Sequence, residues 1–276
     1  MSRIAARFAA VRAQGRGALI PFLEAYDPDA ETSMAILRGM PGAGADLIEI
    51  GMPFTDPMAD GPTIQAAGLR GLKAGATLAR TLAMVREFRA GDADTPVILM
   101  GYLNPILSYD PARFCTDAAT AGVDGLIVVD LPTEEADLLS GFAAACGLDI
   151  IRLIAPTTDD ARLPHVLAGS SGFVYYVSIA GITGTRSASS ADLEAAIPRV
   201  RRATSLPIAI GFGVRTPAQA AEASRVADAA VVASALIDTL AASLGPDGRA
   251  GPDTVRRVLD QVQALADGVR GRREAA

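Results

Sequence analysis

A glutamate lies inside a segment that otherwise has the pattern of a buried strand. Glu49 is surrounded by aliphatic residues from 47 to 50, and a proline-rich loop carrying Asp56 and Asp60 follows it. Burying an ionisable group costs several kcal/mol unless the group is paired or kept neutral. A strand that accepts this cost commonly has a use for the group, so a carboxyl-based acid/base site is the first hypothesis.

The elements that would position these acids can be read from the hydrophobic pattern. Strands are predicted at residues 18–22, 47–50, 97–102, 125–129, 150–154, 173–177, 207–211 and 229–232, and helices at 32–37, 78–88, 112–121, 133–145 and 217–223. Nearly continuous apolar strands are typical of a parallel sheet covered on both faces. About eight strand–helix units without a linker favour a (β/α)8 TIM barrel. A doubly wound open sheet is less favoured, because no glycine fingerprint follows an early strand.

The whole chain, residues 1–276, is expected to form one barrel domain. An amphipathic helix within residues 1–15 is expected to cap the barrel bottom, and a final helix at 252–266 to close the ring. Residues 271–276 are expected to be a disordered tail.

Composition narrows the function classes. The 276 residues are 50% hydrophobic and carry a formal net charge of -6, which argues against nucleic acid as a partner. No signal peptide or membrane-spanning run is found, so a cytoplasmic protein is expected. Cys115 and Cys146 are expected to be reduced thiols, and the lone His165 to lie at the surface or pack against a helix. No metal site or histidine-based triad is therefore expected.

In a parallel barrel the active site forms at the carboxyl ends of the strands. Side chains alternate along a strand, so Glu49 is predicted to face the lumen, where desolvation would raise its pKa. Asp60 has two readings: a second catalytic acid, or a turn former or N-cap of a helix starting near Pro62. For Asp56 the structural role is favoured more strongly. Asp130 lies at the end of the fourth strand, and either a catalytic role or a turn-forming role is possible for it.

Three later glycine- or serine-containing segments have the character of phosphate cradles. They are residues 181–184, 211–213 and 233–235, after the sixth, seventh and eighth strands. Backbone amides and a helix N-terminus there would bind a phosphate. Strand side chains could also hold a flat aromatic substrate; they are Phe22, Met100, Tyr102, Leu126, Ile127, Val129, Leu153 and Tyr175. Arg152 is predicted to extend between the helices with its charge toward solvent.

These segments together resemble the tryptophan synthase alpha chain family over nearly the whole length. The resemblance is carried by residues 47–65, 100–105, 124–132, 153–157, Ser178 with 181–184, and 211–214. It implies a barrel enzyme that splits indole-3-glycerol phosphate into indole and glyceraldehyde 3-phosphate by retro-aldol cleavage.

The resemblance also implies roles for particular residues. Glu49 and Asp60 match the family's catalytic pair, and Tyr175 matches a pocket tyrosine that assists. The implied phosphate ligands are Gly184, Gly213 and Ser234, and the implied substrate contacts are Phe22, Met100, Tyr102, Ile127, Leu153, Thr183 and Phe212.

Family members assemble with a beta subunit as an alpha-beta-beta-alpha heterotetramer and pass indole to it. Pyridoxal phosphate belongs to that subunit, so no cofactor is expected in this chain. The implied partner surface consists of Pro53, Phe54, Asp56, Met58, Asn104 and Pro105, and residues 179–190 resemble a mobile lid.

The chain departs from the family pattern at Ala233, where glycine is usual, and at residues 179–180, where a more polar pair is common. The first departure would weaken phosphate binding if the backbone there needed glycine. A stand-alone lyase that releases free indole stays the alternative, because the same residues would serve it. A non-catalytic subunit and another phospho-sugar barrel enzyme are disfavoured by the intact segment from Glu49 to Gln65.

Overall fold

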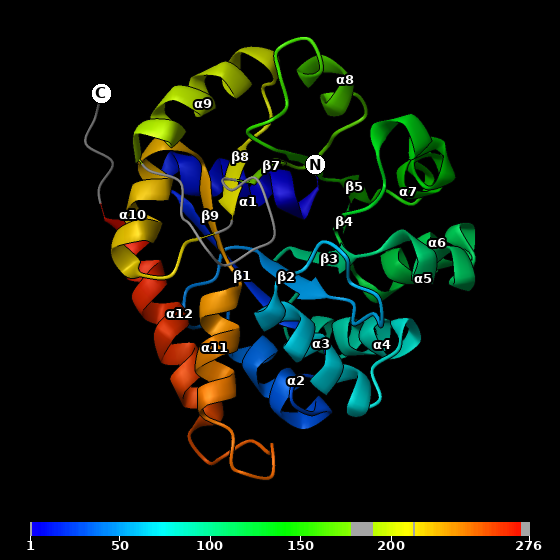
Figure 1. Ribbon diagram of the computed structural model, residues 1–276, viewed down its shortest axis with the longest axis vertical. Helices are drawn as coiled ribbons and strands as arrows, with labels where there is room; N and C mark the ends of the chain where they lie inside the picture. Colours follow the sequence, from blue (N-terminus) through cyan, green and yellow to red (C-terminus); the bar gives the residue numbers. More distant parts are fainter. Residues whose placement is uncertain (1, 178–189, 212, 272–276) are drawn as a thin grey trace.

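The computed structural model describes residues 2–177, 190–211 and 213–271. All of its strands are parallel, in the order β5-β4-β3-β2-β1-β9-β8-β7-β6. The strands are β1 (Ala18–Glu24), β2 (Ile48–Gly51), β3 (Val97–Gly101), β4 (Gly125–Val128), β5 (Asp149–Ile150), β6 (Arg152–Ile154), β7 (Val174–Val177), β8 (Ile208–Gly211) and β9 (Ala229–Val232). Figure 1 shows them at the centre of a ring of helices. The predicted TIM barrel is confirmed.

The fifth predicted strand is divided in two. β5 pairs with β4, β6 pairs with β7, and Ile151 lies between them, its amide donating to Leu126 O. The two pieces therefore act as one barrel strand that changes neighbours along its length. Among the described residues, nine strand segments thus form the eight-unit arrangement expected from the sequence.

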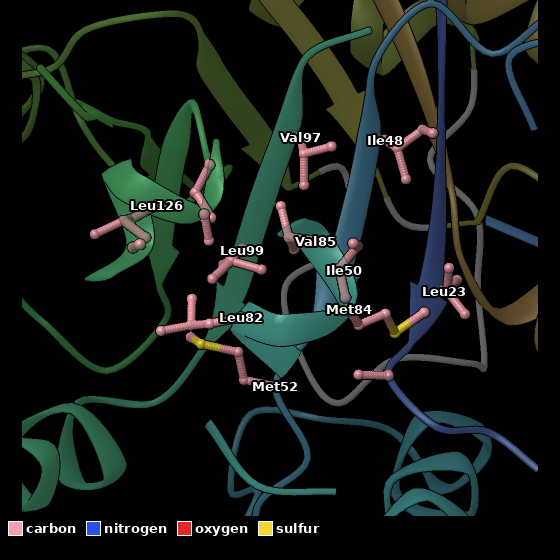
Figure 2. Close-up of a cluster of buried hydrophobic side chains, with 14 of the residues drawn as sticks. Leu23, Ile48, Ile50, Met52, Leu82, Met84, Val85, Val97, Leu99 and Leu126 are labelled. Carbon is pink, nitrogen blue, oxygen red and sulfur yellow. The ribbon is translucent and has the colours of Figure 1, made fainter. Parts of the chain in front are cut away.

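Helices follow the strands around the outside of the barrel. They are α2 (Ala30–Gly39), α3 (Pro62–Lys73), α4 (Leu78–Arg89), α5 (Leu103–Tyr109), α6 (Pro111–Ala121), α7 (Ser140–Ala145), α8 (Leu163–Leu167), α9 (Ser190–Ala203), α10 (Pro217–Val226), α11 (Ser234–Ala242) and α12 (Thr254–Arg270). Figure 2 shows the layer beneath α4, where Ile50 and Leu99 of the strands pack with Leu82 and Val85 of the helix.

One predicted helix is wrong in detail. Residues 133–145 form a 3-10 helix, η1 (Thr133–Leu138), followed by α7 rather than one continuous helix. The break lies at Leu139, which is fully buried and has a non-helical φ of -137°. Burial of this leucine overrides the helical propensity of the surrounding alanines.

The helix α1 (Arg3–Ala13) covers the bottom of the barrel, and Figure 1 shows it crossing behind the strands. Ile4, Phe8 and Val11 join the buried cluster of lumen residues. The ring of Phe8 packs 5.7 Å from that of Phe173, centroid to centroid. The expected tail beyond residue 271 lies outside the described residues.

Candidate active site at the barrel mouth

Glu49 lies in the lumen, and no cation is paired with it in the part of the chain that the structure describes. On β2 it is level with Phe22 of β1 and Ile98 of β3. Leu47 of the same strand face belongs to the lumen cluster, whereas Ile48 belongs to the cluster under the helices. The Glu49 side chain is fully buried, and neither carboxyl oxygen has a hydrogen-bond partner among the described residues. Burial raises its pKa to about 8, so the carboxyl group holds its proton at neutral pH.

Tyr175 brings a phenol group to the same part of the lumen. It lies on β7 between Leu153 of β6 and Ala209 of β8. Burial raises its pKa well above the usual range, and the charge of Glu49 adds to that rise. A Cβ atom on Gly211 would overlap the Tyr175 ring and hydroxyl, so the glycine at the end of β8 leaves the space that the ring occupies.

Asp60 ends the loop between β2 and α3. Gly61, not Asp60, is the N-cap of α3, so the capping role considered from the sequence is not observed. The pKa of Asp60 is raised to about 6, because burial outweighs a hydrogen bond from Tyr102 that lowers it. The Tyr102 hydroxyl also accepts from Ala59 N at 3.0 Å, and so holds the end of the loop at the mouth.

A cavity of about 830 Å³ opens at the mouth of the barrel. Asp60, Met100 and Leu153 of the predicted site line it. A smaller hollow beside it is lined by Phe22 and Tyr102 together with Asp60 and Met100. Ile127 lies deeper, fully buried in the lumen cluster with Tyr175.

The segments expected to bind phosphate are only partly described. Gly213 has a φ of +91°, a left-handed conformation that favours glycine. Ser234 is the first residue of α11, where free backbone amides are available for an anion. Ala233 has a φ of -117°, so its backbone does not need glycine. Thr183, Gly184 and Phe212 lie outside the described residues, as do positions 179–189 of the expected lid.

The residues expected to face a partner form one side of the mouth. Met58 is 76% exposed, Asp56 and Asn104 are exposed, and Pro53, Phe54 and Pro105 are half-buried. The Phe54 ring packs 5.4 Å from that of Tyr102, which joins the loop to the start of α5. The segment around Asn104 is helical, a feature the sequence reading missed.

Asp130 and Arg152, whose roles the sequence did not decide, both bind backbone groups of neighbouring segments. Asp130 Oδ1 accepts from Leu103 N at 2.8 Å and so binds the first turn of α5. Arg152 is buried at 5% exposure, and its Nη1 donates to Leu131 O at 3.0 Å. The predicted extension of Arg152 toward solvent is wrong, because its guanidinium group is used to hold the β4–η1 loop.

The histidine and the cysteines have ordinary environments. His165 is half-exposed on α8, with Nε2 3.2 Å from Glu134 Oε1. Cys115 is buried, Cys146 is partly buried, and both are free thiols. Over the described ranges, no group of three or more histidine, cysteine or acidic side chains is arranged to hold a metal. No described helix is long and apolar enough to cross a membrane.

Sequence reasoning missed one acid at the mouth. Glu24 ends β1, is 5% exposed, and lines the smaller hollow together with Asp60. The signal that drew attention to Glu49, a carboxylate at the end of an apolar strand, is present for Glu24 as well. The predicted strand stopped at residue 22, two residues too early to include it.

A parallel (β/α)8 barrel with buried carboxyl groups near its mouth defines the class of the protein, a barrel enzyme suited to acid/base chemistry. Comparison with known proteins narrows the class further. The family model for "Tryptophan synthase alpha chain" matches residues 8–269. Proteins of that name from Gluconacetobacter diazotrophicus and Granulibacter bethesdensis are similar to this chain. The first is 72% identical, covering 99% of this chain and 100% of the relative. The second is 71% identical, covering 100% and 99%.

Solved structures agree with the sequence comparisons. Tryptophan synthase subunit alpha from Legionella pneumophila has a TM-score of 0.89 at 36% identity, covering 98% of each chain. A Mycobacterium tuberculosis tryptophan synthase structure has a TM-score of 0.87 at 36% identity, again covering 98% of each chain. The chain belongs to the tryptophan synthase alpha chain family. It is a biosynthetic lyase that cleaves indole-3-glycerol phosphate, and in this family the pyridoxal phosphate is held by the beta subunit.

Proposed function

We propose that Glu49 and Asp60 carry the cleavage, with Tyr175 beside Glu49. The observation that supports this most directly is the Glu49 carboxyl group, which is fully buried, has no hydrogen-bond partner among the described residues and has a pKa of about 8. A group that keeps its proton at neutral pH, yet loses it within reach of that pH, is suited to give and take a proton in turn.

The bond to be broken joins C3 of the indole ring to the side-chain carbon that carries a hydroxyl group. Protonated Glu49 gives its proton to C3, and the ring nitrogen becomes electron-poor. The Glu49 carboxylate then takes the hydroxyl proton. The C–C bond breaks, its electron pair returns to the ring, and the hydroxyl carbon becomes the aldehyde of glyceraldehyde 3-phosphate. Glu49 ends protonated, as it began.

Asp60 has the complementary task. An ionised Asp60 accepts the indole N–H and stabilises the positive charge that develops when C3 is protonated. Its pKa of about 6 leaves it ionised at neutral pH, while Glu49 is still protonated. Two carboxyl groups at one mouth thus take different roles because their environments separate their pKa values.

The remaining predicted site residues would bind the rest of the substrate. Phe22, Met100, Tyr102 and Leu153 surround the space beside Asp60 and would hold the ring, with Ile127 forming the floor. The amides at Gly213 and Ser234 would bind the phosphate, and Gly184 with Thr183 and Phe212 would complete that end.

We also propose that a beta subunit binds the face formed by Pro53, Phe54, Asp56, Met58, Asn104 and Pro105, in an alpha-beta-beta-alpha assembly in the cytoplasm. The exposed Met58 beside half-buried Pro53 and Phe54 supports an interaction surface. The same exposure disfavours the alternative of a stand-alone lyase, which would have no need of an apolar loop there.

The experiment is indole release from indole-3-glycerol phosphate by the purified chain, with and without a tryptophan synthase beta subunit. Weak release that rises strongly with the beta subunit is the expected result. Strong release that the beta subunit leaves unchanged would refute the partner proposal and favour the stand-alone lyase. Absence of indole under both conditions would refute the proposed site chemistry.

A further inference from the structure

Glu24 is a buried acid that the cleavage described above does not use. It ends β1, and alternation along the strand places it on the same side as Ile20 and Phe22, whereas Leu23 packs under the helices. No ion pair or side-chain hydrogen bond joins Glu24 to another residue in the described part of the chain.

Two glycines lie next to this carboxyl group. A Cβ atom on Gly51, at the end of β2, would overlap Glu24 Oε2. A Cβ atom on Gly68, inside α3, would lie 3.7 Å from Glu24 Oε1. The carboxyl group is thus enclosed between the end of β2 and one side of α3, and the absence of a side chain at Gly51 leaves the space that it occupies.

The charged groups around Glu24 are mostly acids. Asp60 faces it from the loop before α3, across the small hollow that both residues line. Asp27 follows it in the chain but is already paired with Arg70 of α3, with Arg70 Nε 2.6 Å from Asp27 Oδ1. Tyr102 lines the same hollow, and Glu49 precedes Gly51 by two residues on β2. No unpaired cation among the described residues faces Glu24, so nothing there favours its ionised form.

We propose that Glu24 is a positioning residue that stays a neutral acid beside Asp60, so that the pair carries one negative charge and Asp60 alone holds it. Two carboxyl groups that share a site ionise one at a time, because the first charge opposes the second. This inference rests on the proposed role of Asp60, which must be ionised to accept the indole N–H.

The order of ionisation follows from the surroundings. Burial, then the charge of Asp60 and then that of Asp27, raise the pKa of Glu24 well above its usual range. Asp60, with a pKa of about 6 and a hydrogen bond from Tyr102, loses its proton first. The coupling is mutual: removing the Asp60 charge must make Glu24 easier to ionise.

Infrared spectroscopy of the full chain with 13C-labelled glutamate side chains tests this directly. The wild type is expected to show protonated glutamate C=O absorption at pH 7, of which Glu24→Gln removes one component and Glu49→Gln another. In Asp60→Asn the Glu24 component should disappear at a pH about one unit or more below the pH at which it disappears in the wild type. In Glu49→Gln its midpoint should stay where it is.

The inference is overturned if the Glu24 component is absent at pH 7, or if its midpoint does not move in Asp60→Asn. Should Glu24→Gln fail to fold, the component that survives in Glu49→Gln and shifts in Asp60→Asn identifies Glu24. Indole release is measured on the same preparations. Turnover by the wild type without the infrared shift refutes this inference alone, whereas the shift without turnover supports it and refutes the proposed chemistry.

Discussion

At the scale of single residues, the site depends on placing a carboxyl group where solvent cannot reach it. Glu49 has an ordinary pKa of 4.5 when unfolded and about 8 in the folded chain. Folding therefore takes up a proton between these pH values. The same burial that would make Glu49 a usable acid at neutral pH lowers the stability of the fold, as expected for the proposed catalytic role.

This exchange predicts a pH-dependent gain in stability for Glu49→Gln. Below pH 4.5 the carboxyl group is protonated in both states and costs nothing through ionisation. As the pH rises toward about 8, the unfolded state gains by ionising and the wild type is destabilised, on the order of 4 kcal/mol between pH 5 and 8. The free energy of unfolding of Glu49→Gln, minus that of the wild type, should therefore increase as the pH rises to 8. A wild-type-minus-variant difference that is constant over this range would contradict the raised pKa.

At the scale of elements, the ends of the strands are shaped to fit the side chains between them. Gly211 at the end of β8 and Gly51 at the end of β2 occur where a Cβ atom would overlap Tyr175 or Glu24. These small residues let β7 and β1 aim large polar side chains at the mouth. Packing there is so close that adding a single methyl group should change the stability of the fold.

Gly211→Ala should therefore displace Tyr175 and lower the free energy of unfolding by about 1–3 kcal/mol. Denaturant unfolding measures the loss, and indole release should fall with it. Gly141→Ala is the matched control. This exposed glycine of α7 has nothing within 4 Å of its added Cβ, so the change should be neutral or slightly stabilising. Equal losses in both variants would mean that Gly211 is not fitted to Tyr175.

At the scale of the whole molecule, the packing that closes the barrel and the residues of the proposed site lie at opposite ends of the barrel. Its bottom is closed by α1, through Ile4, Phe8 and Val11 in the lumen cluster. Its mouth carries the acids, the cavity and the loop with exposed Met58. A partner bound over that loop would lie next to the cavity in which we propose that indole forms.

Met58→Asp is expected to weaken binding of the beta subunit at least about fivefold, because truncating an interface anchor commonly costs more than 1 kcal/mol. Titration of the variant with beta subunit, followed by indole release or calorimetry, measures the change. Leu69→Asp serves as the control, since Leu69 is also exposed, at 54%, but lies on α3 outside the proposed face. Unchanged binding by Met58→Asp would place the partner elsewhere.

The sequence was sufficient for the architecture because buried parallel strands have a simple pattern. The apolar runs predicted each barrel strand, and alternation predicted that Glu49 faces the lumen. The sequence was insufficient where tertiary contacts determine the backbone conformation or the position of a side chain. The break at Leu139 and the turn of Arg152 toward Leu131 depend on neighbours far away in the chain. Glu24 went unnoticed because the predicted strand stopped at residue 22, and only the fold shows that Asp60 lies beside it.

The most direct test of the account is the pH dependence of kcat/KM for indole release by the wild type, Glu49→Gln and Asp60→Asn, each with the beta subunit present. The plot of kcat/KM against pH should be bell-shaped for the wild type. Protonation of Asp60 removes the N–H acceptor below about pH 6, and deprotonation of Glu49 removes the proton donor above about pH 8.

Glu49→Gln should lose about 10²–10⁴-fold or more in activity, since both proton transfers depend on this group. Asp60→Asn should be severely impaired and should lose the acid limb. Activity of Glu49→Gln within about tenfold of wild type, or an acid limb that persists unchanged in Asp60→Asn, would contradict the assignment of these two carboxyl groups.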